Sequence, residues 1–145
     1  MEFQIIETTL KDLSDEQCAI LRKMTLIGSG EETGSEMQHA LDSHAQKTDI
    51  PCIIAVDPRK SSEESYLGWS LVINYWRNDQ KFVQVFVKPE HRQNGIGRCL
   101  VNHFRDRYQT LGLPARDKLF CFRWNGTSGA FYNSLNMVDV FLIQV

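Results

Sequence analysis

One stretch, Val83 to Leu100, limits the folds open to this chain more than any other. It reads VQVFVKPEHRQNGIGRCL: an apolar run typical of a β-strand, a polar turn, two glycines and the start of a helix. Pro89 cannot donate a backbone hydrogen bond within a central sheet, so regular strand pairing is expected to stop there. A strand that enters a helix through a glycine turn directs several N–H groups at one point, and the helix dipole also favours negative charge. The pattern predicts a phosphate or pyrophosphate site.

Two common phosphate-binding motifs do not fit this stretch. A P-loop needs a glycine, four residues and then Gly-Lys-Ser or Gly-Lys-Thr, and that string is absent. A dinucleotide fingerprint needs a third glycine where this chain has Leu100. What remains is Arg92-x-x-Gly95-x-Gly97, preceded by Val-x-Val-x-Pro. With these residues the chain resembles the GCN5-related N-acetyltransferase (GNAT) family, whose acetyl-coenzyme A signature is Arg/Gln-x-x-Gly-x-Gly/Ala after a strand.

The order of the expected elements resembles the same family nearly end to end. Strands are predicted at 3–10, 52–56, 66–76, 81–87, 118–124 and 138–145. Helices are predicted from the capping boxes Ser14–Gln17 and Thr33–Glu36, from 96 to 111, and as a short segment ending near 135. We therefore expect one domain over 1–145 of the α/β (α+β) class. Its GNAT-like mixed, mostly antiparallel sheet has about six strands, is flanked by four helices, and splays between the fourth and fifth strands.

The resemblance also implies how acetyl-CoA is held. The splayed strand edge leaves backbone groups unpaired, and the two amides of pantetheine can pair with them. The pyrophosphate then falls on the glycine loop, where two arginines add positive charge. The implied cofactor-binding residues are Val85, Phe86, Val87, Arg92, Gln93, Asn94, Gly95, Ile96, Gly97, Arg98 and Asn125.

The reaction implied is attack of an amine on a thioester, which needs an oxyanion donor and a proton for the leaving thiolate. A backbone N–H of Phe86 or Val87 is the expected oxyanion donor. Tyr132 is the expected general acid, because family members place a tyrosine beside the coenzyme sulfur. No general base is assigned, because the two central strands at 81–87 and 118–124 hold no carboxylate. The candidates left open are Glu31, Glu32, Glu36, His39 and a chain of waters.

We therefore expect an acetyl-CoA-dependent N-acetyltransferase that acts on a primary amine of a small molecule or a protein. One alternative is a coenzyme-A-binding regulatory module without turnover. Another is a toxin or effector that acetylates aminoacyl-tRNA or a host protein. The net charge of −2 argues against a general nucleic-acid binder.

The composition also indicates the cellular environment of the protein and whether it holds a metal. No apolar run approaches the roughly 20 residues that span a bilayer, and the first ten residues do not resemble a secretory signal. The four cysteines lie far apart and predict free, mostly buried thiols in a reducing cytoplasm. His39 and His44 are five residues apart, one more than a helical metal pair needs, so no metal is expected.

Two features depart from the family pattern. Asn136 stands where the family usually has a glycine after the short helix. The family usually ends in a two-strand hairpin, whereas only one strand is expected here, over 138–145. Either the sheet ends early or a second subunit covers its edge, which makes a homodimer a hypothesis.

Overall fold

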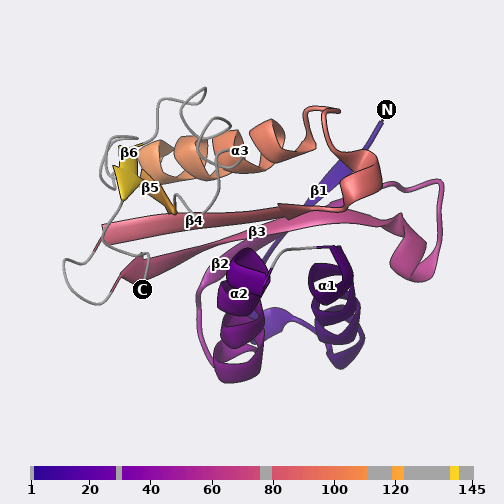
Figure 1. The fold of residues 1–145 in the computed structure, drawn as a ribbon, viewed down its shortest axis with the longest axis horizontal. Coiled ribbons are helices and arrows are strands. Elements are labelled where there is room, and N and C mark those ends of the chain that lie inside the picture. The colour runs from indigo at the N-terminus through magenta and orange to yellow at the C-terminus, as the bar shows by residue number, and fades with distance from the viewer. Residues whose placement is uncertain (1, 29–30, 76–79, 111–118, 123–137, 141–145) are drawn as a thin grey trace.

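The chain folds into a mixed sheet with helices on both faces (Figure 1). This computed structural model describes residues 2–28, 31–75, 80–110, 119–122 and 138–140. The described residues form six strands in the spatial order β1-β2-β3-β4-β5-β6. The elements are β1 (Gln4–Thr9), a 3₁₀ turn (Leu10–Asp12), α1 (Asp15–Gly28), α2 (Glu31–His44), β2 (Pro51–Val56), a 3₁₀ turn (Ser62–Ser65), β3 (Tyr66–Tyr75), β4 (Gln80–Val87), a 3₁₀ turn (Pro89–His91), α3 (Ile96–Thr110), β5 (Leu119–Phe122) and β6 (Val138–Val140).

Strand pairing confirms the predicted mixture of antiparallel and parallel neighbours. β1 to β4 form an antiparallel meander, and β5 joins β4 in parallel after the crossover through α3. Among the described residues, β4 and β5 pair at Lys81↔Leu119 and Phe82↔Phe120, whereas β4 continues to Val87. The remaining length of β4 is where the sheet was expected to splay.

Two apolar layers hold the helices on the sheet. On one face the predicted stripe of α3 buries Ile96, Leu100 and Phe104 against strand residues that include Ile53 and Ala55. On the other face α1 and α2 cover residues of β2, β3 and β4 (Figure 1). This second layer contains Leu10, Leu13, Cys18, Leu21, Met24, Met37, Ala40, Leu41, Cys52, Ile54, Val56, Trp69, Leu71 and Phe86. The two layers fix β4 between α3 and the α1–α2 pair.

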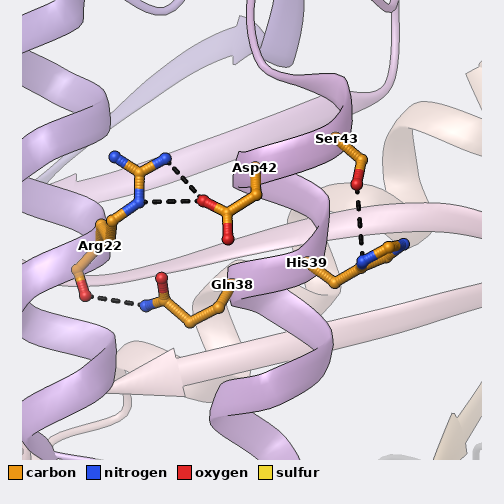
Figure 2. Close-up of polar contacts among 5 residues, drawn as sticks. All are labelled: Arg22, Gln38, His39, Asp42 and Ser43. Carbon is orange, nitrogen blue, oxygen red and sulfur yellow. Dashed lines mark hydrogen bonds and ion pairs between the residues drawn. The ribbon is translucent and has the colours of Figure 1, made fainter.

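Hydrogen bonds cap the start of α1, and polar contacts farther along join α1 to α2. The predicted capping box at the start of α1 is present, since Gln17 N–H donates to Ser14 Oγ at 3.0 Å and Ser14 N–H donates to Gln17 Oε1 at 2.9 Å. Farther along, the Arg22 guanidinium pairs with Asp42 at 2.8 Å. The Gln38 amide donates to the Arg22 carbonyl at 2.8 Å (Figure 2).

Some predicted boundaries were wrong and others lie outside the described residues. The second helix begins at Glu31, so the expectation that Thr33 caps it was wrong. A cap contributes only about 1 kcal/mol, which an added helical turn can outweigh. The helix expected to end near residue 135 lies outside the described residues. Of the strand expected at 138–145, the described part is β6, which pairs in parallel with β5. No helix in the described ranges is long and apolar enough to cross a membrane.

Candidate functional site

The register between β3 and β4 decides which backbone groups of β4 are turned toward β5. Just beyond the strand, Lys88 N–H donates to the Leu67 carbonyl at 2.9 Å, so these two residues form a hydrogen-bonded antiparallel pair. Such pairs alternate along the ladder, which makes Trp69↔Phe86 the next hydrogen-bonded pair. The backbone groups of Phe86 are therefore directed at β3. This differs from the sequence expectation that Phe86 offers its backbone to the coenzyme.

Val85 and Val87 alternate with Phe86 along β4, so their backbone groups point to the opposite side of the strand. They pair with Ser70 and Gly68, in the non-hydrogen-bonded positions of β3 and β4. Their N–H and C=O groups are therefore directed away from β3, toward the side of β4 where β5 lies. Their side chains pack on the α3 layer, so only the backbone is available on that edge.

Arg92 ties the loop after β4 back to the end of the strand. Its Nε donates to the Val87 carbonyl at 2.9 Å, and its Cζ lies 5.9 Å from the centre of the Phe86 ring. Both contacts hold the guanidinium close to the last residues of β4. One of the two Val87 backbone groups expected to be unpaired is thus already a hydrogen-bond acceptor.

The loop that follows has a backbone shape suited to a close-approaching anion. Gln93 and Gly95 both adopt the left-handed region, with φ of 65° and 80°. A Cβ placed on Gly95 would meet no atom within 4 Å, so the space beside this residue is open. The amide of Asn94 donates to the His91 carbonyl at 3.1 Å and braces the turn from within. The glycine is needed for its φ rather than for packing.

The first turn of α3 completes this loop. Cys99 N–H donates to the Gly95 carbonyl at 3.0 Å, which makes Gly95 the residue that starts the helix. The N–H groups of Ile96 and Gly97 precede that first bond, in the position where a helix attracts anions. Arg98 is exposed in the same turn. Burial raises the pKa of the Cys99 thiol, so this cysteine is not an activated nucleophile.

Gly68 is a residue that the sequence analysis missed. A Cβ placed on Gly68 would lie 2.6 Å from the Phe86 carbonyl oxygen and 3.1 Å from the Val87 Cα. Any side chain would push the end of β4 away from β3. The available signal was a glycine inside a strand pattern, which often marks a close backbone approach.

Gln84 was missed as well. It pairs with Leu71, is 3% exposed, and lies on the sheet face that α1 and α2 cover. The signal was a polar residue that alternates with Phe86 on an otherwise apolar strand face.

The remaining sequence-predicted residues are not assembled by the described part of the structure. Tyr132 and Asn125 lie outside the described residues, and the side chains of Glu31, Glu32 and Glu36 are not described. His39 is exposed on α2, where its Nδ1 lies 3.5 Å from Ser43 Oγ (Figure 2). Within the described ranges, no three His, Cys, Asp or Glu side chains gather into a group that could hold a metal ion.

Comparison with known proteins identifies the family of this chain and the solved structures that share its fold. The family model described as "Acetyltransferase (GNAT) family" matches residues 21–137. A search of curated proteins finds no match.

Among solved structures, an acyl-CoA N-acyltransferase from Pseudomonas aeruginosa has 15% identity and a TM-score of 0.68, with 99% of this chain and 94% of that chain covered. Glucosamine-6-phosphate N-acetyltransferase from Arabidopsis thaliana has 15% identity and a TM-score of 0.60, with 100% and 97% covered. A Clostridium acetobutylicum protein described as a predicted acetyltransferase with acetyl-CoA has 13% identity and a TM-score of 0.60, with 96% and 92% covered. At these identities the likeness shows the fold alone.

Proposed function

This chain belongs to the acetyltransferase (GNAT) family, and we propose that it transfers the acetyl group of acetyl-CoA to a primary amine of a small molecule or a protein. The observation that carries the proposal is the joint between β4 and α3. There a left-handed glycine with open space beside it starts a helix just after β4, a strand on which the backbone groups of Val85 and Val87 are directed away from β3. This arrangement supports a ligand with both an amide-bearing arm and a pyrophosphate.

In this proposal the pantetheine arm lies along β4 on the side where β5 stands. Its amides pair with the backbone of Val85 and Val87, whose polar groups the register directs to that side. The pyrophosphate lies on residues 93–98, where the N–H groups of the helix start and the charge of Arg98 favour it. Arg92 has a structural role instead of binding the pyrophosphate, because its contacts hold the loop against the end of β4.

The chemistry requires one bond to form and one to break. The lone pair of the neutral amine attacks the thioester carbonyl carbon, and the carbon–sulfur bond then breaks. The N–H of Val85 is our candidate to stabilise the oxyanion, because the register directs that group away from β3 and Val85 lies farther than Val87 from the loop that holds the pyrophosphate. The phenol of Tyr132 gives its proton to the leaving thiolate, and the amine gives its proton to water or to a base reached through water.

Turnover and binding are tested separately. The protein is mixed with acetyl-CoA and a panel of primary amines, thiol release is followed, and coenzyme A binding is measured by calorimetry. We expect binding and amine-dependent thiol release. Binding without release for any amine would favour a regulatory module, and no binding by folded protein would refute the site.

The variant Tyr132→Phe tests the proposed role of Tyr132 as the general acid. The ring is kept and the proton donor is lost, so we expect kcat to fall by about 100-fold while coenzyme A still binds. An unchanged kcat with intact binding would show that Tyr132 does not protonate the thiolate.

A further inference from the structure

One buried side chain of β4 has a hydrogen-bond donor that nothing in the described structure uses. The Nε2 atom of Gln84 is fully buried and has no hydrogen-bond partner in the described part of the chain. Gln38 is another buried glutamine on the α1–α2 side, and its Nε2 donates to the Arg22 carbonyl at 2.8 Å (Figure 2). Buried polar groups are nearly always paired, and an unpaired one costs stability. Gln84 therefore carries a cost that an apolar residue of similar size would not.

Gln84 lies in the middle of β4, between the residues that pair with β5 and the glycine loop. Its nearest described β4–β5 pair is Phe82↔Phe120, only two residues earlier in the strand. The glycine loop lies at the opposite end of the same segment. A coenzyme whose pyrophosphate lies on residues 93–98 and whose arm follows β4 would bring its thioester end toward Gln84.

The direction of the side chain separates it from the coenzyme arm. The arm pairs with backbone groups in the plane of the sheet, on the side of β5. The Gln84 side chain stands off that plane, on the same face as Leu71 and Phe86. A second substrate that reaches the thioester from this face would meet the Gln84 amide.

Resting on the function proposed above, we propose that Gln84 Nε2 donates a hydrogen bond to an oxygen atom of the acceptor substrate, close to the amine that is acetylated. An amide N–H₂ can only donate, so its partner must be a hydrogen-bond acceptor. The amine nitrogen cannot fill that role, because its lone pair attacks the thioester. The acceptor class is therefore amines that carry a carbonyl, hydroxyl or carboxylate oxygen next to the amine. A hydrogen bond made at this buried atom is shielded from water, which strengthens it.

The test compares Gln84→Met with Gln38→Met on pairs of amines of similar size in which a methyl group replaces a hydroxyl group, such as ethanolamine and n-propylamine. Wild type should prefer the oxygen-bearing member of a turned-over pair by about 10- to 100-fold in kcat/KM. Gln84→Met should abolish the preference by lowering kcat/KM for that member only. Gln38→Met should keep the preference.

Thermal unfolding of the free proteins supplies a second readout. Gln84→Met should keep or raise Tm, because it removes an unpaired buried group, whereas Gln38→Met should lower Tm, because it breaks a bond that is made. Equal loss of kcat/KM on both amines of a pair, or no loss on either, would overturn the proposal. If Gln84→Met does not fold, Gln84→Leu is measured in the same way. Absence of turnover in wild type would instead refute the proposed transferase function.

Discussion

Replacing Gly95 with alanine should disturb the coenzyme site more than it disturbs the fold. Gly95 has φ of 80°, a conformation that costs an L-residue about 1–2 kcal/mol. The new methyl group would meet no protein atom within 4 Å, so no steric clash adds to that cost. The methyl would instead occupy the open space that we assign to the pyrophosphate.

The expected loss of stability is small. Alanine also restricts the unfolded chain, which returns about 0.4–1 kcal/mol, so the net loss in unfolding free energy is about 1 kcal/mol. The entropy of unfolding is about 2.1 cal/mol/K per residue, or about 0.3 kcal/mol/K for a chain of 145 residues. Tm should therefore fall by about 3 °C.

Calorimetric titration with coenzyme A and a thermal melt measure the two effects separately. Gly95→Asn is the matched control, because asparagine tolerates the left-handed region but also introduces a Cβ. Both variants should raise the Kd for coenzyme A at least about tenfold, or about 1.4 kcal/mol, and only the alanine variant should lose the full 3 °C. An alanine variant with a raised Tm would refute the strain argument. An unchanged Kd in both variants would show that the coenzyme does not use this space.

Two further predictions concern stability. Thr25→Val should lower the unfolding free energy by about 1–3 kcal/mol in urea melts, because it leaves Trp69 Nε1, which donates to Thr25 Oγ1 at 2.8 Å, buried without a partner. Thr25→Ser, which keeps the hydroxyl, should lose less, and equal losses would contradict this reasoning. Hydrogen bonds from the Arg59 side chain and backbone lower the pKa of Asp57 from 3.8 to about 2. The stability from this pair should therefore be complete above about pH 4 and be lost as the pH falls through 2. Asp57→Asn should remove that acid-dependent loss in melts from pH 6 to pH 2, and identical pH profiles for both proteins would disprove the assignment.

Local chemistry explains why several elements were predictable. The Ser14–Gln17 box and the α3 stripe depend on residues three or four apart, which the chain places together wherever it folds as a helix. The second capping box failed for the same reason, since a local preference worth about 1 kcal/mol does not decide where a helix packed on another helix begins. The joint between β4 and α3 was predictable because a glycine with a left-handed backbone is itself a local requirement.

By itself, the sequence determined the strand, the glycine turn and the helix that follows it, together with the family they indicate. Only the tertiary structure decided that the backbone of Phe86 belongs to β3, that Gly68 must lack a side chain, and that Gln84 keeps a buried donor unused. Each of these depends on which residues of a second strand or helix stand opposite. Pairing register and burial are properties of two segments distant in the sequence, so no single stretch of residues specifies them.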